Sequence, residues 1–161
     1  MADIITMWPW RNYRNDTSDG SEFHYEFNSD QERFFDLSRR GDNLWLISSR
    51  RIADATLYCL LACLVVIDKS RNASDDPFIG YGVYKVRGDS QKSRYFDPNQ
   101  TDITDLLFQL RFNPFKPFRF PRSEKQKMGS ALQTVGELTK EDSQKLQDLA
   151  SQLAVINPAR D

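Results

Sequence analysis

The sequence is poor in the residues that most enzymes use for catalysis. It has one histidine, His24, among 161 residues, which is too few for a multi-histidine zinc or nuclease site. No Gly-x-Ser-x-Gly, Walker or Gly-x-Gly-x-x-Gly motif occurs, and the Asp-x-Lys or Glu-x-Lys pair of many metal-dependent nucleases is absent. The sequence therefore predicts a binding protein that is not an enzyme and that carries no cofactor or metal.

Cysteine is scarce as well. Cys59 and Cys63 both lie in the most apolar run, residues 57–67, whose eleven residues fall short of the about twenty that a membrane-spanning helix needs. On a strand, two residues four positions apart are separated by about 13 Å, beyond the ~7 Å between Cα atoms that a disulfide tolerates. We expect free buried thiols in a reducing cytoplasm, and no association with a membrane.

Length and composition favour one domain that spans residues 1–161. Apolar residues make up 39% of the chain and charged residues 28%, which is typical of globular proteins and leaves enough apolar surface for one core. The first residues carry no basic and apolar export signal, which agrees with a cytoplasmic location.

The hydrophobic pattern predicts an α+β protein. Ser29-x-x-Glu32 and Thr139-x-x-Asp142 have the spacing of helix starts, and the run 57–67 is apolar on both faces, as in a central strand. A short basic turn is predicted between residues 49 and 57, and 93–96 is predicted to pair with 81–86 in a hairpin. Strands are expected at 3–10, 21–27, 43–49, 57–67, 81–86 and 93–96, and helices at 30–38, 101–110, after Ser123 and at 140–153.

The strands cluster before residue 110, so residues 1–110 are expected to form a curled, mostly antiparallel sheet or a small β-barrel with flanking helices. Residues 111–161 would add a basic Pro/Phe segment and a helical C-terminus. In that segment three prolines favour an extended surface chain. Its cations, Arg119 and Arg122 among them, alternate with phenylalanines, a combination that suits single-stranded or flipped-out nucleic acid but also suits a loop clipped onto the core.

Three tryptophans are candidates for a binding site. Trp8 and Trp10 flank a proline at the end of the first predicted strand, where an aromatic ring commonly lines a pocket or packs in the core. Trp45 lies between Leu44 and Leu46, so a core position competes with a role in recognition.

Two hydroxyl groups and two cations follow the strand that contains Trp45. Ser48 and Ser49 followed by Arg50 and Arg51 can hold a phosphate, and a solvated turn explains them equally well.

The order of these features resembles the PUA-like superfamily, in particular EVE, ASCH and YTH-type domains, over residues 1–110. The resemblance rests on the aromatic opening strand, Gly41-Asp42 before the strand with Trp45, the long apolar strand, and the GYGVYKVRGD hairpin. Members of that group commonly bind RNA or hold a modified base, extruded from DNA, in an aromatic cage. By resemblance, Trp8, Trp10 and Trp45 would form the cage, Ser48 and Ser49 would donate to the base or a phosphate, and the arginines would contact phosphates, namely Arg50, Arg51, Arg119 and Arg122.

These observations lead to the hypothesis of a nucleic-acid reader for a modified base, with DNA favoured over RNA. Some bacterial domains of this broad type are attached to nucleases, so a nuclease chain or domain is an expected partner. Two other hypotheses stay open: a protein-interaction domain that docks through the Pro/Phe segment, and a small-molecule enzyme or ligand-binding barrel with an enclosed carboxylate pair.

Overall fold

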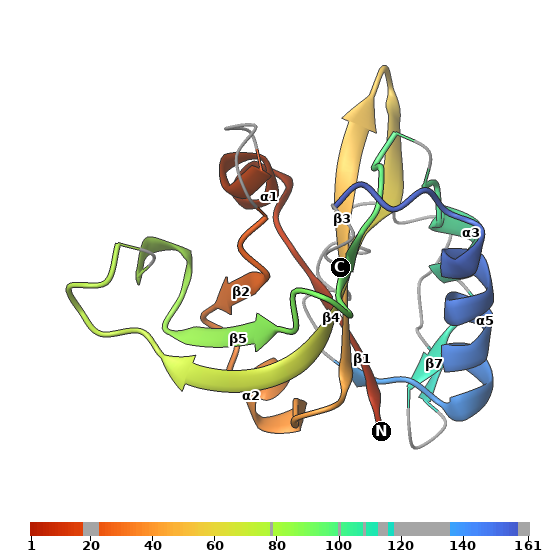
Figure 1. The fold of residues 1–161 in the computed structure, drawn as a ribbon. Coiled ribbons are helices and arrows are strands. Elements are labelled where there is room, and N and C mark those ends of the chain that lie inside the picture. The colour runs from red at the N-terminus through yellow and green to blue at the C-terminus, as the bar shows by residue number, and fades with distance from the viewer. Residues whose placement is uncertain are drawn as a thin grey trace.

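A computed structural model describes residues 1–17, 23–77, 79–99, 101–107, 109–112, 116–117 and 136–157. These residues form an α+β fold, as the sequence predicts, with four helices around a seven-stranded sheet (Figure 1). In chain order the elements are β1 (Asp3–Met7), α1 (Trp10–Thr17), β2 (Glu26–Ser29), α2 (Glu32–Leu37), β3 (Asn43–Ile52), β4 (Ala55–Arg71), a 3-10 turn (Ile79–Tyr81), β5 (Tyr84–Gly88), β6 (Arg94–Tyr95), α3 (Thr104–Leu107), β7 (Arg111–Phe112), β8 (Lys116–Pro117), β9 (Gly136–Glu137) and α5 (Lys140–Ser151).

The large sheet is mixed and open. Its strands follow the order β2-β5-β4-β3-β1-β9, and β6 pairs with β4 beside this path. β1 pairs with β3 in parallel, whereas the other pairings among the described strands of the sheet are antiparallel. Because β2 and β9 end the path without pairing to each other, the sheet does not close, and the barrel form of the prediction is wrong.

β4 is the central strand that its apolar run predicted. Its first part pairs with β3 and its last part pairs with β5, after a register shift between Val66 and Asp68. Residues 58–64 are buried, because helices or chain segments cover both faces of the sheet at this point. The shift turns β4 from one part of the sheet into the other, which curls the sheet (Figure 1).

Two apolar clusters fill the two faces of the sheet. One lies between the sheet and the C-terminal layer of α3 and α5, and includes Trp45, Leu107 and Leu146. The other lies on the side of α1 and α2, and includes Trp8 and Phe34. Figure 1 shows these helix pairs on opposite sides of the sheet.

Several local predictions need correction. Trp10 does not end a strand but begins α1, which occupies most of the stretch between the first two predicted strands. Pro9 can start a helical turn, and its carbonyl accepts from Tyr13 N at 3.1 Å. Ser29 does not cap α2; the cap residue is Gln31, and Ser29 Oγ accepts from its backbone N–H at 3.1 Å.

The strand pairing around β6 also differs from the prediction. β6 pairs with Ala62 and Cys63 of β4 and not with β5, and the C-terminal chain fixes it there through Asn157, whose Oδ1 accepts from Tyr95 N at 2.7 Å. The predicted N-cap of the last helix is confirmed, because the Thr139 side chain accepts from Asp142 N. The helix predicted after Ser123 lies outside the described residues.

The β3–β4 connection is tighter than the predicted basic turn. β3 continues to Ile52 and β4 starts at Ala55, so only Ala53 and Asp54 connect the strands. The two arginines of the predicted turn therefore lie on a strand. Figure 1 shows this hairpin reaching beyond the rest of the fold.

In the part of the chain that the structure describes, the search for a helix with the length and apolar character needed to cross a bilayer finds none.

Candidate functional site

Trp45 is a core residue. Its side chain is 0% exposed, and its indole Nε1 donates a hydrogen bond of 2.8 Å to Asp3 Oδ1. The ring is therefore packed in the core, and its N–H group has a hydrogen-bond partner. The parallel pairing of β1 with β3 brings this carboxylate to the indole. Trp45 therefore offers no face to a ligand, and the core alternative from the sequence is the correct one.

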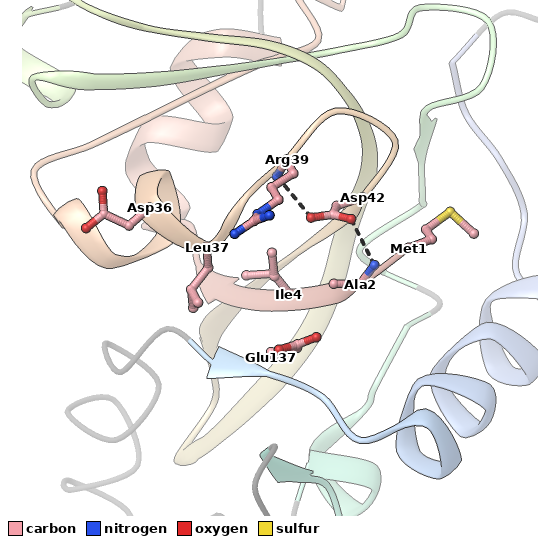
Figure 2. Close-up of a pocket in the computed structure, with 8 residues that line it drawn as sticks. All are labelled: Met1, Ala2, Ile4, Asp36, Leu37, Arg39, Asp42 and Glu137. Carbon is pink, nitrogen blue, oxygen red and sulfur yellow. Dashed lines mark hydrogen bonds between the residues drawn. The ribbon is translucent and has the colours of Figure 1, made fainter.

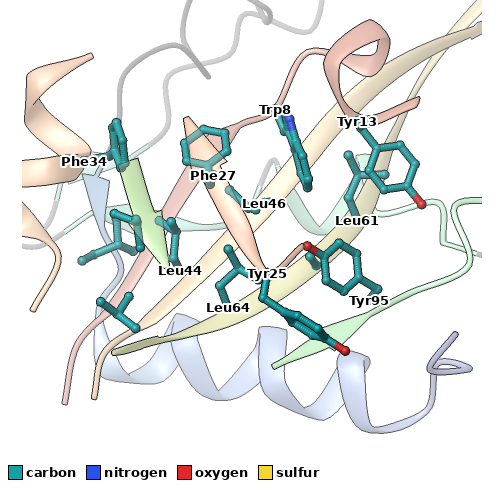
Figure 3. Close-up of a cluster of buried hydrophobic side chains, with 14 of the residues drawn as sticks. Trp8, Tyr13, Tyr25, Phe27, Phe34, Leu44, Leu46, Leu61, Leu64 and Tyr95 are labelled. Atoms are coloured by element: carbon teal, nitrogen blue, oxygen red, sulfur yellow. The ribbon is translucent and has the colours of Figure 1, made fainter. Parts of the chain in front are cut away.

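Trp8 is buried on the other face of the sheet. Its side chain is 2% exposed and lies edge-on to Tyr13 and Phe27, with ring centroids 5.4 and 5.8 Å apart. Figure 3 shows the indole inside this aromatic cluster. Because Trp8 and Trp45 lie on opposite faces of the sheet and are both enclosed, the expected cage of three indoles is not formed.

Trp10 is the partly exposed tryptophan. It occupies the first position of α1, and the guanidinium of Arg50 lies over its ring at 4.3 Å from the centroid. Arg50 Nη1 also donates a hydrogen bond of 2.8 Å to Asn99 Oδ1. The ring and the amide thus hold this guanidinium in one orientation, in a cation–π geometry that is favourable at surfaces.

Further arginines are close to this pair in the sequence. Arg51 follows on β3, and Arg11 and Arg14 follow Trp10 on α1; all three are exposed. Arg14 is one helical turn after Trp10, which places the two side chains on the same side of α1. We call these residues the α1–hairpin surface: Trp10, Arg11, Arg14, Arg50 and Arg51.

None of the described carboxylates forms an ion pair with an arginine of the α1–hairpin surface. A different arrangement holds at the opposite end of β4. There Lys85 lies 3.6 Å from Glu26 and 3.9 Å from Asp76, and Lys69 Nζ donates to the Phe35 carbonyl at 2.6 Å. The arginines of the α1–hairpin surface therefore keep their charge available for an anionic partner, whereas the lysines Lys69 and Lys85 at the other end of β4 are engaged within the fold.

The two serines of the predicted site are placed differently. Ser48 is 1% exposed, and its Oγ has no hydrogen-bond partner among the described residues. Its neighbour on β4 is Cys59, so it faces the interior and cannot reach a phosphate. Ser49 is partly exposed at the base of the hairpin and stays available.

Burial holds three titratable side chains, Tyr13, Cys59 and Cys63, in their neutral forms. Burial raises the pKa of Tyr13, and burial raises the pKa of the Cys59 thiol to about 11 and that of Cys63 to about 12. Both cysteines are free and buried, as predicted. A thiol with so high a pKa is protonated at neutral pH, so neither cysteine is an activated nucleophile.

Two pockets lie away from the tryptophans, near the start of β1. The first, of about 420 Å³, is lined by Met1, Ala2, Ile4, Asp36, Leu37, Arg39, Asp42 and Glu137 (Figure 2). Asp42 accepts the backbone N–H groups of Ala2 and Arg39 at 2.8 and 2.9 Å, so its carboxylate is engaged by the chain itself. The second pocket, of about 370 Å³, adjoins it and shares Met1, Ala2 and Glu137. Three carboxylates against one arginine in the first pocket disfavour a phosphate there.

Within the described residues no group of three or more His, Cys, Asp or Glu side chains is arranged to hold a metal ion. Of the predicted site residues, the structure brings together Trp10 and Arg50, and it places Arg51 next to Arg50 on β3 with its side chain on the other face of the strand. It separates Trp8, Trp45 and Ser48 from the surface. Arg119 and Arg122 lie outside the described residues. Arg11, Arg14 and Asn99 were not predicted, because the hydrogen bond of Asn99 to Arg50 and the stacking of Trp10 on Arg50 are contacts between distant parts of the chain.

Comparisons with protein-family models and with curated proteins find no match for this chain. The resemblance to PUA-like domains therefore stays a prediction.

Proposed function

We propose that this protein binds nucleic acid, DNA in preference to RNA, through the α1–hairpin surface. The observation that carries the proposal is the Arg50 guanidinium, held over the Trp10 ring at 4.3 Å and, like the exposed arginines next to it in the chain, without an ion pair to any described carboxylate. An arginine fixed in this way loses little side-chain entropy when it binds a phosphate, and its planar donors match phosphate oxygens.

The charge of this surface sets the expected strength of its salt dependence. Each phosphate that an arginine neutralises releases counterions and contributes a slope of about −0.9 to a plot of log affinity against log salt for duplex DNA. Four arginines in contact with phosphates would give a slope of roughly −3 to −4. Such a slope distinguishes phosphate contacts from binding driven by apolar surface.

Recognition of a modified base is the second part of the proposal, and it rests on the resemblance. Trp10 is the partly exposed one of the three cage candidates and already stacks on Arg50, so a cage of three indoles around an extruded base does not form, and the base would be read beside this surface. The chain would act as the reader, and a nuclease chain or domain would supply any cleavage. No catalytic role is assigned to its residues.

Fluorescence anisotropy tests this proposal. Labelled single- and double-stranded oligonucleotides, of DNA and of RNA, are titrated with the protein at 50 and 200 mM salt. The proposal expects duplex DNA to bind with an affinity that falls steeply with salt, by about 60- to 260-fold for slopes of −3 to −4. Flat titrations at low salt with every oligonucleotide would overturn it.

A matched pair of variants assigns the binding to the surface. Arg50→Gln should weaken binding and reduce the salt slope by about 1, the contribution of one phosphate contact. Arg71→Gln is the control, because Arg71 also lies over an aromatic ring, Tyr84 at 5.5 Å, but at the other end of β4. Equal effects of the two variants would remove the α1–hairpin surface from the proposal.

The competing hypothesis of a protein-interaction domain depends on the Pro/Phe segment. Nearly all of that segment lies outside the described residues, so no observation favours it here.

A further inference from the structure

The tip of the β3–β4 hairpin carries a second feature that phosphate binding does not explain. Residues 51–55 are all exposed, and Ile52 is an apolar side chain with 48% of its surface in solvent. Ile52 pairs with Ala55, and Asp54 lies between them in the two-residue turn. Ile52 and its cross-strand neighbour Ala55 therefore present apolar surface to solvent at the end of the hairpin.

We infer that this tip enters the major groove of duplex DNA and contacts base edges there, an inference that rests on the proposed function. The two-stranded ribbon matches the groove in size. The major groove is about 12 Å wide and admits a β-ribbon, whereas the minor groove, about 6 Å wide, is too narrow for two strands with their side chains. The deep and narrow major groove of A-form RNA excludes the same ribbon.

The length of the hairpin tip also matches the depth of the major groove. From Arg50 to the turn at Ala53 the strand rises by roughly 10 Å, close to the groove depth of about 8.5 Å. When the turn reaches the base edges, Arg50 is therefore at the level of the phosphates. Its fixed orientation on Trp10 then positions the ribbon, and the exposed Arg11 and Arg14 lie on the flanking helix, where they can contact the same backbone.

The chemistry of the turn selects one base edge. In the major groove a pyrimidine presents its C5 position beside its C4 substituent, which is an amino donor in cytosine and a carbonyl acceptor in thymine. The Asp54 carboxylate can accept from the amino group of cytosine and repels the carbonyl of thymine. Ile52 and Ala55 offer apolar contact to a methyl group at C5. The edge that satisfies both features is a cytosine methylated at C5, read within the duplex without extrusion.

The test compares four duplexes that differ only in one central base pair, with cytosine, 5-methylcytosine, thymine or uracil at the contacted position. The inference expects 5-methylcytosine to bind about fourfold more tightly than cytosine, the effect of burying one methyl group. It also expects thymine to bind more weakly than 5-methylcytosine. Ile52→Ser should abolish the methyl preference, and Asp54→Asn should reduce the discrimination against thymine.

Val83→Ser is the matched control, since Val83 is a similarly exposed apolar residue, at 40%, near the other end of β4. It should preserve all preferences. Equal, salt-dependent binding of the four duplexes, unchanged by Ile52→Ser, would overturn the inference and leave the proposed function standing. Binding of single strands alone would also overturn the inference, and the absence of binding to any oligonucleotide would overturn both.

Discussion

The inner and outer parts of the β3–β4 hairpin belong to the same two strands but lie in opposite environments. Residues 44–48 and 58–64 are buried between the two apolar clusters, and residues 51–55 are exposed beyond them. The inner part contains Trp45 with its indole donor satisfied by Asp3, and the outer part contains Arg50, whose cation rests on Trp10. We attribute stability to the inner part and recognition to the outer part, so substitutions in the two should have separable effects.

The largest expected effect is the difference in the free energy of unfolding that is lost when each of the three tryptophans is replaced by alanine. Trp45→Ala and Trp8→Ala should each lower the free energy of unfolding by about 3–5 kcal/mol, because each leaves a large cavity in the core. Trp10→Ala should cost about 1 kcal/mol or less, since it removes a partly exposed ring and one cation–π contact. Urea denaturation followed by circular dichroism measures these values. A loss for Trp10→Ala as large as that for Trp45→Ala would break the distinction between the two regions.

Alkaline pH should destabilise the inner part through its thiols. The unfolded thiols titrate near pH 9, whereas burial holds the pKa of Cys59 at about 11 and of Cys63 at about 12 in the folded chain. Above about pH 9 the folded state therefore keeps protons that the unfolded state loses, and stability falls by up to about 1.4 kcal/mol per pH unit for each thiol.

Urea titrations between pH 8 and pH 10.5 measure this slope. Burial also raises the pKa of Tyr13 and Tyr58, which contribute in the same direction in every variant. The double variant Cys59→Ala/Cys63→Ala should therefore show a shallower decline than the parent chain. If it declines as steeply, the thiols are not the cause.

A smaller effect should separate charge from orientation in the outer part. Arg50→Lys keeps the positive charge but loses the planar guanidinium that stacks on Trp10 and bonds to Asn99. We expect duplex affinity to fall about threefold, roughly 0.7 kcal/mol, with an unchanged salt slope. Anisotropy titrations at several salt concentrations decide this, with Arg71→Lys as the control; a change in slope would mean that the number of phosphate contacts has changed.

The smallest effect concerns the turn. Ala53 has φ +53°, a left-handed conformation that disfavours any side chain. Ala53→Gly should raise the free energy of unfolding by about 0.5 kcal/mol, because the relief of strain exceeds the entropy that glycine loses on folding. A lower stability, measured by urea denaturation, would show that the native turn does not strain Ala53.

Local patterns predicted the parts of the fold that depend on neighbouring residues. The apolar run identified β4, and Thr139 identified the start of α5, because a strand's burial and a helix cap are properties of short segments. The sequence left the position of Trp45 open, because Trp45 and its neighbours Leu44 and Leu46 fit a strand whichever of its two faces is covered.

Contacts between distant segments were beyond the sequence. The parallel register that joins Asp3 to Asn43, the α1 helix that places Trp10 under Arg50, and the docking of Asn157 on Tyr95 each join residues forty or more positions apart. Of the residues in the proposed interface, the sequence predicted Trp10, Arg50 and Arg51. Arg11 and Arg14 could not be predicted as part of this surface, because their place in it depends on the position of α1 beside β3.

The most direct test of the account is a titration of the uniformly ¹⁵N-labelled protein with duplex DNA that contains a central 5-methylcytosine, followed by two-dimensional NMR. We expect the largest chemical-shift changes at the amides of residues 10–14 and 50–56, with little change at Lys69, Arg71 and residues 84–88. Changes concentrated at the β4–β5 end, with the hairpin amides unmoved, would contradict the assignment of recognition to the outer hairpin.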